Sequence, residues 1–120
     1  MPRVELDELS NYEFQYRLTV RATDLNYASQ LGNEPLLGLV HEARAQFLKQ
    51  LKFNTIIQDD QHIGVIIADL VVNFRAEAFA QDQITIDCQI GDLGERLFRL
   101  FHRIRRAEQV IALVESGTVA

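Results

Sequence analysis

Basic residues are scarce in this sequence of 120 residues, and so are cysteines and long apolar runs. Lysine and arginine together number 12, against 17 aspartates and glutamates, so the formal net charge is −5 at pH 7. A nucleic-acid groove needs a dense basic face to displace counterions from phosphates, and an anionic membrane surface attracts basic segments. We therefore expect neither nucleic acid nor membrane as a partner.

Few side chains in the sequence could bind a metal or form a disulfide. Cys88 is the only cysteine, which excludes an intramolecular disulfide and any zinc site built from several cysteines. The three histidines, His41, His62 and His102, are too scattered for a metal-ligand set. We predict no metal site, and a reducing, intracellular setting fits best.

Targeting and membrane signals are also missing from the sequence. The first ten residues carry three acidic side chains instead of a basic and apolar signal sequence. No stretch approaches the roughly 18 apolar residues of a membrane span. With 120 residues and 48% hydrophobic composition, we predict a soluble cytoplasmic protein made of a single domain over residues 1–120.

Five segments have the pattern of β-strands, at 12–21, 64–74, 83–90, 96–105 and 109–119. Most alternate apolar and polar residues with a period of two, which indicates one buried and one wet face. The second segment is apolar on both faces, so we predict a central strand there. Gly-Asp-Leu-Gly after the third segment is a good hairpin turn, and 54–62 is a polar connection.

One long helix is predicted at 33–51, between the first and second strands. Asn33 is a residue type that is favoured at helix N-caps, and Pro35 would lie in the first helical turn, where a missing N–H costs nothing. Its apolar positions step by four, three, four and four: Leu36, Val40, Ala43, Phe47 and Leu51. Three further leucines widen this stripe, so the helix is largely buried. The layout is α+β, with a helix packed on an antiparallel sheet.

The order and spacing of several motifs resemble the hotdog-fold acyl-CoA thioesterases of the hydroxybenzoyl-CoA thioesterase class. These motifs are Val-Arg-Ala-Thr-Asp at 20–24, Leu-Gly-Asn at 31–33, His-Glu-Ala-Arg at 41–44, Val-Asn-Phe-Arg-Ala-Glu-Ala at 72–78 and Gln-Asp at 81–82. The resemblance implies a hotdog fold, in which a five-stranded antiparallel sheet wraps a long central helix. It also implies a homodimer joined sheet edge to sheet edge, with tetramers common and active sites at the subunit interface. The substrate would be an acyl-CoA thioester, with no cofactor beyond the coenzyme A of the substrate.

A helix N-terminus can supply part of this chemistry on physical grounds. It carries roughly half a positive charge and unpaired N–H groups, which stabilise an oxyanion in a dry pocket. By spacing, the donor would be the amide of Asn33, helped by Gly32. An ordinary helix cap is the competing interpretation of Asn33.

Two positions depart from the pattern of the family. Where the resemblance implies Asp-x-Asp, with the second carboxylate catalytic, this chain has Asp24-Leu25-Asn26, and Gln30 stands in place of a frequent histidine. Asn26-Tyr27 resembles a subgroup that reads Asp-x-Asn-Tyr. Asn26 and Gln30 can position a water or the thioester oxygen, and we keep Tyr27 as a substrate-binding candidate.

Hydrolysis then needs a carboxylate from elsewhere, because an amide cannot take a proton from water. Glu42, on the helix, and Asp24, at the exit of the first strand, are the candidates. A surface ion pair is the structural alternative for Glu42, and an Asx-type loop contact is the alternative for Asp24. His41 could serve as a base near neutral pH, although a lone helical histidine is more often structural.

Arg75 is the leading candidate for the CoA phosphates, with Arg99, Arg103 and Arg105 as further candidates unless they simply form a solvated strand face. Asp69 interrupts an apolar strand, so we expect a structural hydrogen bond there.

Three functions remain open. The leading hypothesis is acyl-CoA hydrolysis, and the alternative is a non-catalytic hotdog module that binds acyl-CoA or an acyl carrier protein. A dehydratase is weaker, because Gln30 removes the expected histidine.

Overall fold

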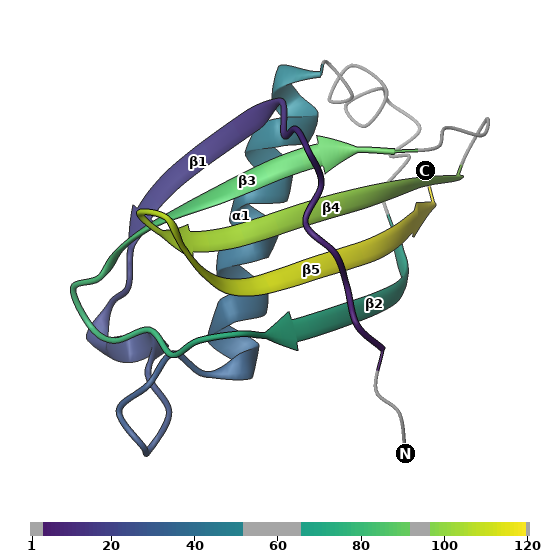
Figure 1. The fold of residues 1–120 in the computed structure, drawn as a ribbon. Helices are drawn as coiled ribbons and strands as arrows, with labels where there is room; N and C mark the ends of the chain where they lie inside the picture. The colour runs from purple at the N-terminus through teal and green to yellow at the C-terminus, as the bar shows by residue number, and fades with distance from the viewer. Residues whose placement is uncertain (1–3, 52–65, 92–96, 120) are drawn as a thin grey trace, which may run out of the picture.

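Over the residues that the structure describes, a five-stranded antiparallel sheet with one long helix on one face makes up the fold (Figure 1). The computed structural model describes residues 4–51, 66–91 and 97–119. The strands are β1 (Phe14–Thr19), β2 (Ile66–Phe74), β3 (Gln83–Ile90), β4 (Leu97–Arg106) and β5 (Gln109–Val119). A short 3-10 helix, η1 (Ala22–Asp24), and the helix α1 (Asn33–Gln50) lie between β1 and β2. The predicted α+β layout is confirmed. The predicted connection at 54–62 and most of the turn after β3 fall outside the described residues.

The N-cap of the helix lies one residue earlier than the sequence predicts. Gly32 is the N-cap, with an extended backbone (φ −80°, ψ 164°), and Asn33 is the first helical residue. The prediction of Asn33 as N-cap is therefore wrong, because the chain turns into the helix at the residue without a side chain. Pro35 still falls in the first turn, where its missing N–H breaks no helical bond.

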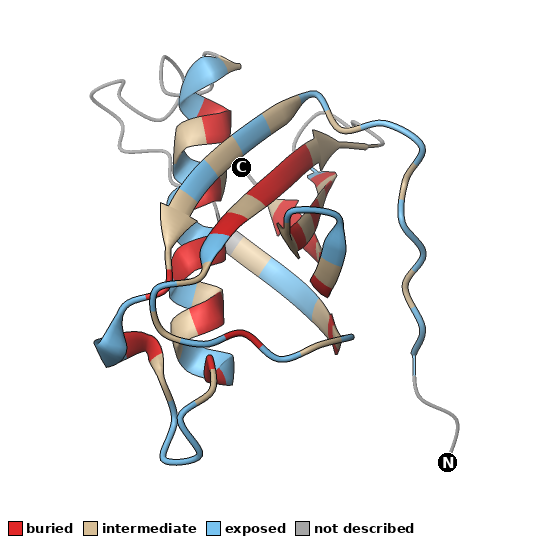
Figure 2. Cartoon of the chain, turned by 60° about the vertical axis from the view of Figure 1, so that its left-hand side comes forward, coloured by how far each residue is buried: buried red, intermediate tan, exposed pale blue. Residues whose placement is uncertain are grey.

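The core lies between α1 and the inner sheet face, where the buried residues gather in Figure 2. The helical stripe predicted from the spacing is buried except at Leu51, which is half-buried. Phe47 stacks on Phe14 of β1 with ring centroids 5.3 Å apart. Each large apolar side chain buried this way contributes about 1.5–3 kcal/mol. The largest fully buried apolar side chains are Phe47, Leu36, Ile84, Ile86, Leu100, Ile104 and Ile111.

The strand order is β1-β3-β4-β5-β2, which places β2 at an edge of the sheet. The prediction of a central strand at 64–74 is therefore wrong for the single chain. The apolar composition of this segment predicts that both faces avoid water, but Ala68, Asp69 and Leu70 are exposed in the structure. Composition does not reveal which strands pair with this one. Leu70 remains 40% exposed at this edge.

The N-terminal segment, residues 4–13, crosses the sheet face opposite the helix (Figure 1). Asn73, at the end of β2, accepts a hydrogen bond from Leu6 N and donates one to the Val4 carbonyl at 2.8 Å. Farther along, Glu8 pairs with Arg103 at 3.1 Å. The segment is thus tied to both β2 and β4.

Candidate active site at the helix N-terminus

The loop between η1 and α1 is a narrow turn at residues 25–31, closed by a bridge between its two ends. Asn26 N donates to the Gln30 carbonyl at 2.7 Å. The side-chain oxygen of Asn26 accepts the N–H groups of Ala28 at 2.9 Å and Gln30 at 3.2 Å. The oxygen is occupied by the loop, so Asn26 has only its amide hydrogens to offer a ligand. Tyr27, at the tip, is fully exposed.

The first turn of α1 leaves backbone donors without a partner. Gly32 N already donates to the Asp24 carbonyl at 3.1 Å, so the expected help from the Gly32 amide is not free. Pro35 has no N–H. Among the described residues, the amides of Asn33 and Glu34 have no acceptor, and both carry the positive end of the helix dipole.

A pocket of about 510 Å³ opens at this helix end. It lies between the loop, the helix and the chain that leaves β2. Its lining residues are Asn26, Gln30, Leu31, Asn33, Phe74, Arg75, Ala76 and Glu77. Four residues that the sequence singled out therefore meet in one cavity, which we call the helix-end pocket.

Arg75 is held in the helix-end pocket by the N-terminal segment. Its guanidinium donates to the Leu6 carbonyl, and its backbone N donates to the Ile111 carbonyl at 2.7 Å. One side of the guanidinium is thereby fixed and the remaining N–H groups are available for an anion. Glu77, two residues later, was not singled out by sequence, where it is simply one more polar residue after a strand.

The two carboxylates proposed from the sequence lie in a second pocket, of about 420 Å³. This pocket, which we call the β1 pocket, flanks the other side of α1, against the opposite edge of the sheet from β2. Its lining residues are Tyr16, Leu18, Thr19, Arg21, Asp24, Pro35, Gly38, Leu39 and Glu42.

Asp24 is committed to a local contact in the β1 pocket. It is 2% exposed, and its carboxylate accepts hydrogen bonds from Arg21 N at 2.8 Å, Nε at 3.2 Å and Nη2 at 2.9 Å. The hydrogen bond from the Arg21 side chain lowers the pKa of Asp24 below its usual range. Glu42 is exposed and accepts a hydrogen bond from Gln46 at 2.9 Å.

His41 and His102 are not among the lining residues of either pocket. His41 is exposed on the helix, where its Nδ1 contacts the Arg44 guanidinium at 2.5 Å. His102 is buried in the core, with Nδ1 3.2 Å from Cys88 Sγ. His62 falls outside the described residues. Within 4–51, 66–91 and 97–119, three or more metal-ligating side chains do not converge anywhere.

Arg99, Arg103 and Arg105 of β4 lie on the outer sheet face, and none of them lines the helix-end pocket. Arg99 pairs with Asp69 at 2.9 Å and with Glu115 at 2.6 Å. Asp69 also accepts the N–H of Gly117 at 3.0 Å, so the structural hydrogen bond expected at this residue is present. Arg99 is thus paired with carboxylates of both β2 and β5.

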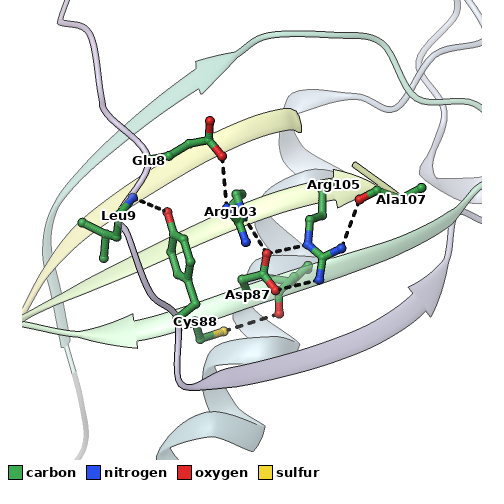
Figure 3. A network of polar contacts seen from close by, with 9 residues as sticks. Glu8, Leu9, Asp87, Cys88, Arg103, Arg105 and Ala107 are labelled. Atoms are coloured by element: carbon green, nitrogen blue, oxygen red, sulfur yellow. Dashed lines mark hydrogen bonds and ion pairs between the residues drawn. The ribbon is translucent and has the colours of Figure 1, made fainter. Parts of the chain in front are cut away.

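Figure 3 shows the second group of charges on this outer face. Asp87 of β3 is fully buried and accepts Nε of both Arg103 and Arg105 at 2.7 Å. Arg103 also lies over the Tyr12 ring, 4.5 Å from its centroid. Buried charges are tolerated when they are paired in this way.

Comparison with known proteins identifies a family. A family model described as the thioesterase-like superfamily matches residues 20–120. A search of curated proteins finds no match. No helix among the described residues combines the length and apolar character needed to cross a membrane.

Solved structures share the fold. A gentisyl-coenzyme A thioesterase is 26% identical, with a TM-score of 0.80 over 88% of each chain. A probable thioesterase from Bartonella henselae is 15% identical, with a TM-score of 0.81 over 88% of this chain and 89% of the other. A 1,4-dihydroxy-2-naphthoyl-CoA thioesterase from Synechocystis is 19% identical, with a TM-score of 0.74 over 88% of this chain and 80% of the other. The predicted hotdog fold is confirmed.

Proposed function

Since the chain belongs to the thioesterase-like superfamily, we propose that it hydrolyses acyl-CoA thioesters to the free acid and coenzyme A. The observation that carries this proposal is that Asn33, whose amide has no acceptor among the described residues, lines the helix-end pocket. Two of the similar structures are named as thioesterases of aromatic acyl-CoAs, so aromatic substrates belong in any test.

The Asn33 amide is the proposed oxyanion donor. When water attacks the thioester carbonyl, negative charge gathers on the carbonyl oxygen, and a fixed N–H at a helix N-terminus stabilises that charge without reorganising. One such donor is worth about 3 kcal/mol of barrier. The amide hydrogens of Asn26 and the side chain of Gln30 line the same pocket and would hold the carbonyl or the attacking water.

Arg75 is the proposed contact for a CoA phosphate. It is the charged donor of the helix-end pocket, and the Leu6 carbonyl restricts its side chain before any ligand arrives. Pre-ordering reduces the entropy lost when an ion pair with phosphate forms. The exposed Tyr27 at the loop tip and His41 on the helix are further proposed contacts of the substrate.

A homodimer joined through β2 fits the sheet. This edge strand is rich in apolar side chains and has unpaired backbone groups, which is a surface that soluble proteins normally cover. A second copy pairing there would make the predicted central strand central in the assembly, and two such dimers could form the expected tetramer. Light scattering should give a dimer or tetramer mass, and a monomer at micromolar concentration would contradict this arrangement.

A non-catalytic module that binds acyl-CoA or an acyl carrier protein is the second candidate. It is favoured by one observation, the amide of Asn26 in place of the family carboxylate. Glu42 and Asp24, the bases proposed from sequence, line the β1 pocket of their own chain and not the helix-end pocket.

Thiol release from a panel of short, medium, long and aromatic acyl-CoAs tests the function. The critical variant is Asn33→Pro, because proline is tolerated in the first helical position and removes only the N–H and the side chain. Asn33→Ala, which keeps the N–H, is the matched control. We expect Asn33→Pro to lose roughly a hundredfold or more in kcat relative to Asn33→Ala. If no acyl-CoA is hydrolysed while calorimetry shows binding, the module is the correct function.

A further inference from the structure

Glu77, an exposed acidic residue, lines the helix-end pocket. Among the described residues that line the pocket, it is the one acidic side chain, and it shares the cavity with Asn33 and Asn26. Its neighbours there include the apolar Leu31 and Phe74. The pocket therefore combines an oxyanion donor, neutral amides, a cation and a carboxylate.

The backbone around Glu77 is held firmly relative to the helix end. Two successive amides before it donate to the Ile111 carbonyl of β5, at 2.7 and 3.1 Å. Its own carbonyl accepts the Arg106 guanidinium at 3.3 Å. The next carbonyl, of Ala78, accepts Leu31 N at 2.8 Å, one residue before the helix cap. This last bond links the bend of Glu77 directly to the start of α1.

The Glu77 carboxylate is also uncommitted. Within the described chain it forms no ion pair and no side-chain hydrogen bond. Asp24, by contrast, has both oxygens occupied by Arg21. Glu42 lies in the β1 pocket, on the other flank of the helix. A base must reach the water that attacks the carbonyl, so location and free lone pairs both favour Glu77.

We propose that Glu77 is the general base of the thioester hydrolysis and replaces a carboxylate that Asn26 cannot supply. The proposal rests on the proposed function. Glu77 takes a proton from water as the water oxygen bonds to the thioester carbon, whose oxygen is held by Asn33 N–H. The C–S bond then breaks, and the protonated Glu77 returns the proton to the departing thiolate. Water is consumed, and a free acid and a thiol are released.

Glu77→Gln removes the base and keeps the shape of the side chain. General bases contribute typically a hundredfold or more, so we expect kcat to fall by roughly 10²-fold or more. Calorimetric affinity for a non-hydrolysable acyl-CoA analogue should change little. The matched control is Glu108→Gln in the turn between β4 and β5, which should hydrolyse at the wild-type rate.

A rescue experiment separates a chemical role from a structural one. Asn26 lines the same pocket, so Asn26→Asp places a carboxylate there while its other oxygen can still accept the loop amides. In the Glu77→Gln background, Asn26→Asp should raise kcat at least tenfold. A merely structural Glu77 predicts that Asn26→Asp raises the rate by the same factor in the wild type and in the Glu77→Gln background, whereas a base predicts a clearly larger factor in the variant.

The outcomes are distinguishable. If the wild-type protein hydrolyses acyl-CoAs and folded Glu77→Gln does so equally well, the role of Glu77 is refuted and the proposed function stands. A low rate in Glu77→Gln without rescue by Asn26→Asp also refutes the role as base. If the wild-type protein releases no thiol from any member of the panel, the proposed function itself fails, and the role of Glu77 with it.

Discussion

His102 should make the protein lose stability in mildly acidic solution. The ring is 1% exposed in the core, and its Nε2 has no hydrogen-bond partner among the described residues. Burial lowers the pKa of His102 to about 3, and the positive charge of Arg44 adds to this effect. Its other ring nitrogen faces the thiol of Cys88, which is also buried. The folded protein therefore keeps this imidazole neutral in neutral and mildly acidic solution.

The size of the effect follows from proton linkage. In the unfolded chain the imidazole has a pKa near 6.5, so between about pH 6.5 and 3 the unfolded state binds a proton that the native state does not. The contribution of His102 is thus complete above pH 6.5 and is lost as the pH falls. The slope is about 1.4 kcal/mol per pH unit, or about 2 kcal/mol between pH 7.5 and 5. Asp24 and Asp69, whose pKa values are lowered by arginine contacts, lose their contribution only below about pH 4.

Urea unfolding of the wild type and of His102→Phe at pH 7.5, 6 and 5 measures the pH-dependent contribution of His102 to the unfolding free energy. Phenylalanine fills a similar volume and does not titrate. The difference between the two proteins isolates the term, because every other titrating group, including His62, is present in both. We expect the wild type to lose about 2 kcal/mol more than the variant by pH 5. Parallel losses in the two proteins would show that His102 is protonated in the folded state, and would refute the reasoning.

Three further predictions concern other parts of the molecule. Asp87→Asn leaves two partly buried arginines without their carboxylate and should cost about 3 kcal/mol of unfolding free energy. Glu115→Gln removes a more exposed carboxylate and should cost less than about 1 kcal/mol. Equal costs in urea unfolding would show that burial does not set the strength of these ion pairs. Asn26→Asp alone should raise the rate of hydrolysis by adding a second carboxylate to the helix-end pocket, and an unchanged or lower rate in a folded variant would exclude this. Burial raises the pKa of Cys88 to about 12, so a thiol reagent at pH 8 should modify it only after unfolding; rapid modification of the native protein would show that the core opens.

Much of the candidate site is already visible in the sequence. Composition and spacing locate the polar loop before the helix, with Asn26 and Gln30, and the helix start at Asn33, because loops and caps have local requirements. A motif after a strand points to Arg75. All four residues line one pocket in the folded protein.

The choice among carboxylates cannot be made in the same way. Glu42 and Asp24 are attractive because they are close in sequence to the helix end, but helix geometry turns Glu42 toward β1, and Asp24 folds back onto Arg21. Glu77 lies more than forty residues from Asn33 in the chain and reaches the pocket through the return of β2. Only the pairing of strands distant in sequence creates that neighbourhood.

Periods of two and of 3.6 residues in the sequence locate the strands and the long helix, and they report which face of the helix and of each alternating strand avoids water. The tertiary structure decided the position of β2 at an edge and the membership of each pocket. Periodicity carries no information on which neighbour covers an apolar face. That depends on long-range strand pairing, which places residues from opposite ends of the chain side by side.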